Sequence, residues 1–160
     1  MDKGSTYISI LIQSLEKKVK VLDQIIESNK EQREILSQEE MDTDRFEANL
    51  NEKGRLIDEL NLLDDGFQEV YERIKEELSG NREAYKDEIK QMQSLISQIT
   101  EKSVTIRAEE EHNRVAAGKQ FENMRGNIQT AKRSRQAANV YYSNMSRVNM
   151  VDAQFMDKRK

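Results

Sequence analysis

The chain has 160 residues, of which 35% are charged and 36% hydrophobic, and it contains no proline, no cysteine and only six glycines. Proline and frequent glycine interrupt helices, so this composition favours long helices that bury narrow apolar seams. The absence of cysteine excludes disulfides, thiolate nucleophiles and cysteine-based metal sites. No signal peptide is recognisable, and no run approaches the ~18 apolar residues of a membrane span. We therefore expect a soluble, cytoplasmic, all-α protein of single-domain size.

Charge is distributed unevenly along the sequence. Residues 1–120 contain 18 Lys and Arg against 27 Asp and Glu, a net charge of −9, whereas residues 121–160 contain 8 against 3, a net charge of +5. The second part is also rich in Met and aromatic residues. This division predicts an acidic helical body over residues 1–118 and a basic tail over residues 119–160 that binds a partner.

A first helix is predicted from about Thr6 to Glu40, because apolar residues recur there in alternating steps of four and three. Asn29 and Arg33 leave a polar gap in this heptad seam. Leu11, Ile25 and Ile35 lie beside the seam and widen it. The predicted seam consists of Ile8, Ile12, Leu15, Val19, Leu22, Ile26, Asn29, Arg33 and Leu36.

A second helix is predicted after residues 41–44 (MDTD), which break the first seam. Asp44 followed by Glu47 resembles a capping box, in which the two side chains would satisfy backbone N–H groups of the first turn. The seam that follows includes one charged residue, Lys53. It consists of Phe46, Leu50, Lys53, Ile57, Leu60, Leu63, Phe67, Tyr71, Ile74 and Leu78.

A third helix is predicted after Gly80 and Asn81. Gly80 suits the position that follows a helix C-terminus, and Asn81 can cap the next helix. The third seam consists of Tyr85, Ile89, Met92, Ile96, Ile99 and Ile106. It fades in the charged run at residues 109–114, which we interpret as solvated helix surface. Long antiparallel helices, as a three-helix bundle or as coiled-coil hairpins, are therefore the expected fold.

The tail shows weaker helical periodicity than the body. Apolar residues keep a helical spacing from Phe121 to Ala138, and the sequence becomes irregular and Asn-rich after Ser143. So few apolar residues cannot compensate the entropy of ordering the tail on its own. We expect a weakly structured helical tail.

No constellation of residues supports catalysis, so we expect a protein that is not an enzyme and that uses no cofactor or metal. The only histidine, His112, lies in the charged run, whereas a metal site requires several converging ligands. The carboxylates of Glu39–Glu40 and of Asp64–Asp65 are sequence neighbours, which point about 100° apart on a helix and suit acid–base catalysis poorly. Phosphate-binding glycine loops and nucleophile motifs do not occur.

The basic tail is compatible with several kinds of partner. Nucleic acid is disfavoured because the positive charge is sparse and the acidic body would repel a polyanion. Stable membrane insertion is disfavoured because the basic residues do not lie opposite one continuous apolar face. A protein partner explains more, since Met and aromatic side chains cover irregular protein surfaces and dispersed positive charge attracts an acidic partner.

The candidate partner-binding residues fall into two groups within the tail. The first group keeps helical spacing, and its members would alternatively extend the third helix against the bundle. The second group lies beyond the clean seam, where partner contact is the simpler interpretation. The first group is Phe121, Met124, Ile128 and Ala131, and the second is Tyr141, Tyr142, Met145 and Phe155.

Four short segments, in their order along the chain, resemble a known family. They are residues 35–40 (ILSQEE), 51–60 (NEKGRLIDEL), 63–67 (LDDGF) and 153–160 (AQFMDKRK). Together they resemble the flagellar type III export chaperones of the FlgN family, in which a Lys followed by a Leu/Ile pair opens a second long helix.

This resemblance implies a cytoplasmic chaperone that binds hook–filament junction subunits and delivers them to the export gate. In the family the C-terminal segment binds cargo, a role that falls here on Phe121, Met124 and Ile128. A tyrosine near that segment helps to dock on the gate, which points to Tyr141 or Tyr142. The chaperones for the filament cap and for flagellin are also small and helical, so either cargo is an alternative.

Two alternatives from other classes stay open. A structural coiled-coil protein would associate with itself through the same seams and form a stable dimer or a larger rod. An accessory nucleic-acid-binding protein would be retained on DNA or RNA in a salt-dependent way. A chaperone is expected to be a monomer or weak dimer that pairs with its cargo.

Overall fold

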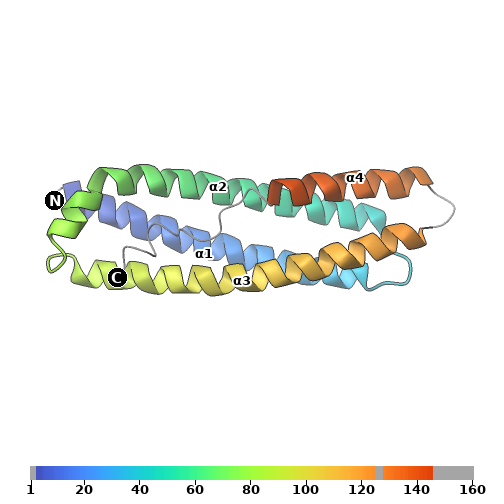
Figure 1. Cartoon of the computed structure of the whole chain (residues 1–160), viewed down its shortest axis with the longest axis horizontal. Coiled ribbons are helices and arrows are strands. Elements are labelled where there is room, and N and C mark those ends of the chain that lie inside the picture. The colour runs from blue at the N-terminus through green and yellow to red at the C-terminus, as the bar shows by residue number, and fades with distance from the viewer. Residues whose placement is uncertain (1–2, 125–127, 146–160) are drawn as a thin grey trace.

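The computed structural model of the protein describes residues 3–124 and 128–145. Within these residues the chain forms four helices and no strand. The helices are α1 (Lys3–Leu36), α2 (Thr43–Gly80), α3 (Lys86–Asn123) and α4 (Ile128–Met145). Figure 1 shows α1, α2 and α3 as long rods that run back and forth beside one another. The predicted all-α fold with three long antiparallel helices is therefore confirmed.

Helix α1 is the shared support of the bundle, because it packs against both α2 and α3 along its length. Its buried row repeats in steps of three and four, as expected for a heptad seam. The row consists of Ile8, Leu11, Leu15, Lys18, Leu22, Ile25, Asn29, Gln32 and Leu36.

Part of the seam predicted for α1 was wrong. Arg33 is exposed, and Gln32, which is 0% exposed, occupies the buried position instead. Val19 and Ile26 are half-buried, while Lys18 and Ile25 are buried. The apolar pairs along α1 fit either of two adjacent rows, and contact with two partner helices decides which row is enclosed.

The helix ends also differ in detail from the predicted caps. Asp42, two residues before the predicted cap, accepts a hydrogen bond from the Arg45 backbone N–H at 3.1 Å and is the N-cap of α2. Asn81 caps the end of α2, because its side-chain amide donates to the Glu77 carbonyl at 2.9 Å. Helix α3 begins only at Lys86.

Helix α4 covers one half of the bundle, beside the first part of α2 and the last part of α3 (Figure 1). It runs in the same direction as α2 and opposite to α3. Contacts with Glu47 and Lys53 of α2 and with Glu110 of α3 fix its position. Among the described residues, the bundle therefore has four helices at one end and three at the other.

A matched pair of leucines tests the packing of α2. Leu60 is 0% exposed and Leu62 is 73% exposed on the same helix. We expect Leu60→Ala to lower the free energy of unfolding by about 2–5 kcal/mol, because the substitution leaves a cavity in the core. Leu62→Ala should change it by less than about 0.5 kcal/mol. Urea denaturation followed by far-UV circular dichroism measures both, and equal effects would contradict the packing described here.

Candidate functional site

Helix α4 packs against α2 and α3 through one face of mostly small side chains. Among the α4 side chains that the structure describes, the buried ones are Ala131, Ser134, Ala138 and Tyr141, in steps of three, four and three. Small side chains allow two helices to approach closely but bury little apolar area. Tyr141 is the large side chain of this row and is 5% exposed.

The Tyr141 side chain covers a lysine that is enclosed in the bundle. Lys53 of α2 has a fully buried side chain, and its Nζ lies 2.8 Å from Glu110 Oε1 of α3. The same Nζ donates to Gln32 Oε1 of α1 at 3.1 Å and lies 4.5 Å from the centroid of the Tyr141 ring. A buried ammonium needs a counter-charge and acceptors, and here the three other helices supply them.

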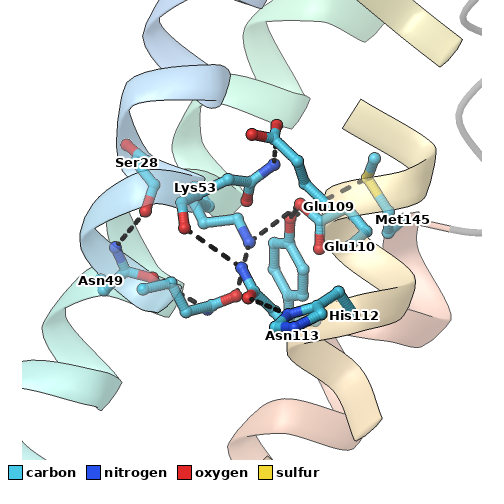
Figure 2. A network of polar contacts seen from close by, with 11 residues as sticks. Ser28, Asn49, Lys53, Glu109, Glu110, His112, Asn113 and Met145 are labelled. Carbon is cyan, nitrogen blue, oxygen red and sulfur yellow. Dashed lines mark hydrogen bonds and ion pairs between the residues drawn. The ribbon is translucent and has the colours of Figure 1, made fainter. Parts of the chain in front are cut away.

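Amide side chains extend this arrangement along α1. Gln32 donates to Asn49 Oδ1 at 2.8 Å, and Asn49 donates to the Ser28 carbonyl at 2.9 Å. On the α3 side, Asn113 donates to the Asn29 carbonyl at 3.2 Å. Figure 2 shows Lys53 among these groups, with Asn49 toward α1 and Asn113 toward α3. We call Gln32, Asn49, Lys53, Glu110, Asn113 and Tyr141 the polar cluster.

Burial and charge set the protonation of the polar cluster. The Tyr141 hydroxyl donates to Glu110 Oε1 at 2.7 Å. Burial, helped by the negative charge of Glu110, raises the pKa of Tyr141, so the phenol stays neutral and serves as a donor. Burial lowers the pKa of Lys53, and its ion pair with Glu110 opposes that change. The Glu110 Oε1 atom is thus the common partner of the Lys53 ammonium and the Tyr141 hydroxyl.

The docking of α4 leaves two polar atoms unsatisfied. Glu110 Oε2 and the Tyr142 hydroxyl are buried and have no hydrogen-bond partner among the described residues. A buried polar atom without a partner costs about 1–3 kcal/mol. Both atoms lie where α3 meets α4, so the contact between these two helices is only partly satisfied.

At the edge of α4, basic side chains meet acidic ones of the body. Arg133 Nε lies 2.9 Å from Glu47 Oε1, and the Ser134 hydroxyl donates to the same oxygen at 3.2 Å. The Arg135 guanidinium lies 5.7 Å from the centroid of the Phe121 ring. Exposed ion pairs contribute about 0–1 kcal/mol each, so the edge contacts orient α4 more than they stabilise it.

The structure places the predicted partner-binding residues in different surroundings. Phe121 belongs to the last turn of α3 and packs edge-on against Phe46 with ring centroids 5.8 Å apart. Met124 directly follows α3, and Ile128 is the first residue of α4. Phe155 lies outside the described residues. On α4, Ala131 and Tyr141 are buried, while Tyr142 and Met145 are half-buried against the core.

The polar cluster was not predicted as a unit, although the sequence contains two indications of it, namely polar residues at seam positions of the first and second helices. Lys53 occupies a seam position of α2, and Asn29 marks the polar gap in the seam of α1. The interpretation of residues 109–114 as solvated surface was wrong for Glu110 and Asn113, which are 6% and 1% exposed. Both belong to the α3 seam, which continues from Ile106 through the charged run to Ala117 and Phe121.

Other kinds of site find little support in the described part of the chain. No group of three or more His, Cys, Asp or Glu side chains there is arranged to hold a metal ion. His112 is exposed, with Nδ1 3.5 Å from Asn113 Oδ1. None of the described helices contains an apolar stretch long enough to cross a membrane.

Comparison with protein families gives a match over most of the chain. The model of a family described as FlgN protein matches residues 1–147, which include all four helices. No curated protein and no solved structure matches the chain.

Removing one partner of the buried ion pair should be far more harmful than replacing both. We expect Lys53→Met to lower the free energy of unfolding by about 3–5 kcal/mol, because Glu110 is left buried without its counter-charge. The double variant Lys53→Met with Glu110→Leu should recover most of that loss. Chemical denaturation of the three chains measures the difference, and a double variant as unstable as the single one would argue against the ion pair.

Alkaline pH should weaken the fold through Tyr141. The unfolded chain loses this phenolic proton near the ordinary pKa of 10.0, whereas the folded chain, with its raised pKa, retains it. Stability should therefore fall as pH rises above about 10, by up to ~1.4 kcal/mol per pH unit. The Tyr141→Phe variant lacks this phenolic proton, so its free energy of unfolding should fall less steeply as pH rises. Denaturation midpoints of both chains between about pH 9 and 11 test this, and parallel curves would contradict it.

Proposed function

We propose that this chain, which belongs to the FlgN family of flagellar export chaperones, binds hook–filament junction subunits through its C-terminal amphipathic segment. In this proposal it acts in the cytoplasm as a monomer or weak dimer and delivers its cargo to the type III export gate. Its part is to bind and release a segment of another protein, and no covalent chemistry is required of it.

The observation that carries this proposal is the amphipathic face of α4. Ala131, Ser134, Ala138 and Tyr141 form one row on α4, next to half-buried Tyr142 and Met145. Such a row suits pairing with an amphipathic helix, as in helix-in-groove recognition. The row is occupied by the body in the described state, so cargo binding through it requires that α4 leaves α2 and α3.

The free energy needed to separate α4 from α2 and α3 is modest. The α4 face consists mainly of small side chains, and its docking leaves Glu110 Oε2 and the Tyr142 hydroxyl buried without partners among the described residues. Undocking would hydrate both atoms and recover their desolvation cost of about 1–3 kcal/mol each. Ordering of the C-terminal segment on the cargo would cost part of the binding free energy, which eases release at the gate.

The cargo segments implied by the family have a matching need. Terminal segments of axial subunits form coils only after assembly, and their apolar stripes would otherwise be exposed in the cytoplasm. An amphipathic helix of the chaperone can cover such a stripe until export. Phe121 is a member of the α3 core beside Phe46, so in this proposal it supports the base of the tail and α4 contacts the cargo.

The two adjacent tyrosines are suited to different roles. Tyr141 is 5% exposed and its hydroxyl is committed to Glu110. Tyr142 is half-buried, packs edge-on against the Tyr141 ring, and has no hydrogen-bond partner for its hydroxyl among the described residues. We therefore assign docking on the export gate to Tyr142, because its side chain is only half-buried whereas Tyr141 is enclosed.

Binding of a purified hook–filament junction subunit tests the proposal. We expect the full chain to form a 1:1 complex, and deletion of residues 128–160 to weaken binding by at least about tenfold, because the contact face is removed. The deletion starts after Phe121 so that the Phe46–Phe121 contact of the body is kept. Isothermal titration calorimetry gives the affinity, and light scattering gives the mass of the complex.

The body of the truncated chain must stay helical for this comparison, which circular dichroism verifies. Unchanged affinity after the deletion would remove the tail from the binding site. A stable homodimer that ignores the subunit would instead support the self-associating coiled coil. Preferential binding of filament cap or flagellin would reassign the cargo within the same class of chaperone.

A further inference from the structure

The surface beneath α4 has features of a binding site in its own right. We define the α4 groove as the surface of α2 and α3 that contacts α4, with Glu47, Lys53, Glu110 and Phe121 as its reference residues. Helices α2 and α3 pack mainly against α1 and make few contacts with each other. A helix-wide surface between them is therefore filled by α4 in this half of the bundle (Figure 1).

We propose that the α4 groove is a second contact for the cargo: a helix of the cargo enters it when α4 leaves, while α4 contacts another part of the same cargo, so that loss of α4 still weakens binding. The partner is an amphipathic helix with small side chains at the positions of Ala131, Ser134 and Ala138 and a hydrogen-bond donor at the position of Tyr141. The identity of the partner as cargo rests on the proposed function, whereas the existence of a helix receptor does not.

A buried carboxylate oxygen points to a ligand other than α4. The Glu110 side chain is 8% exposed, and its Oε1 already accepts from both Lys53 and Tyr141. Its Oε2 is buried without a hydrogen-bond partner among the described residues. A partner helix with an additional amide, guanidinium or hydroxyl donor at this point would satisfy both oxygens. Such a helix would fit the groove better than α4 does.

Charge at the edge of the α4 groove adds a second element of recognition. Glu47 is contacted by both Arg133 and Ser134, and Asp44 lies 3.8 Å from the Arg133 guanidinium. An entering helix therefore gains from a basic residue beside its row of small side chains. Acidic cargo segments would be disfavoured at this edge.

The polar cluster explains how the groove would discriminate between helices. A site built to accept a hydrogen bond rejects a ligand that lacks the donor, because its buried acceptor is left unpaired. Lys53 fixes the position of Glu110 Oε1 from α2, and Gln32 fixes Lys53 from α1. The acceptor is therefore held by the body and does not depend on α4.

The test uses the full chain with α4 forced out of the groove. Ala138 is 3% exposed, so Ala138→Glu should expel α4, while the matched control Asn139→Glu introduces the same side chain at the next, exposed position of the same helix. The probe is a fluorescently labelled peptide with the sequence of residues 128–145. We expect it to bind Ala138→Glu at least about tenfold more tightly than the wild-type chain or Asn139→Glu, by anisotropy.

A second arm tests the role of Glu110. The same peptide carrying Tyr141→Phe should bind Ala138→Glu about tenfold more weakly, because the donor to Glu110 is missing. In a chain that also carries Lys53→Met and Glu110→Leu, the two peptides should bind equally. Circular dichroism confirms that each variant keeps its helices.

The outcomes separate this proposal from the proposed function. Equal peptide affinity for Ala138→Glu and Asn139→Glu, with both chains helical, overturns the α4 groove as a receptor even if a junction subunit binds the tail. Equal affinity of the two peptides for Ala138→Glu overturns the recognition by Glu110. If the Ala138→Glu chain binds the peptide tightly but binds no junction subunit, the α4 groove is supported as a helix receptor. The same result contradicts the claim that its ligand is a helix of the cargo.

Discussion

The ion pair between Lys53 and Glu110 is the constraint on which the rest of this bundle depends. It joins α2 to α3, two helices that otherwise rest on α1 more than on each other. A charge pair in a helical core must be surrounded by polar groups, because water cannot solvate it there. Gln32 from α1 and Tyr141 from α4 fulfil that need, so one buried lysine determines which side chains face inward on three other helices.

This constraint changes how the basic tail is understood. From the sequence the tail is a surface for a partner, separate from an acidic scaffold. In the structure residues 128–145 of the tail form α4, whose inward face packs on the scaffold, and Arg133 of this helix pairs with Glu47 at the edge. The residues proposed to bind cargo are thus the residues that α4 uses to bind its own body. In the proposed function, cargo binding and release would be two states of this one face, and the polar cluster lies where α4 contacts the body.

The extent to which sequence predicts this molecule follows from the kind of pattern involved. Three long helices follow directly from the heptad spacing and the absence of proline, which need no knowledge of tertiary contacts. The pattern also marks Lys53 as a seam residue. The pattern does not predict that Gln32 is buried and Arg33 exposed, or that Glu110 is buried among three consecutive glutamates. These residues are polar sequence neighbours, and only the position of the facing helix decides which of them is buried. The packing of α4 on the body could not be predicted, because Ala131, Ser134 and Ala138 are only weakly hydrophobic or polar. Their small size nevertheless allows α4 to pack closely against α2 and α3.

The central position of α1 has a kinetic consequence. Because α4 packs on α2 and α3 while α1 holds those two helices together, α4 can open without loss of the contacts that define the body. Such a segment behaves as a separate cooperative unit with its own low opening free energy. Amide protons of α4 would then exchange much faster than those near Leu22 or Leu60, which only global unfolding exposes. A chaperone built this way can exchange partners at the rate of a local opening while its folded body persists through many cycles.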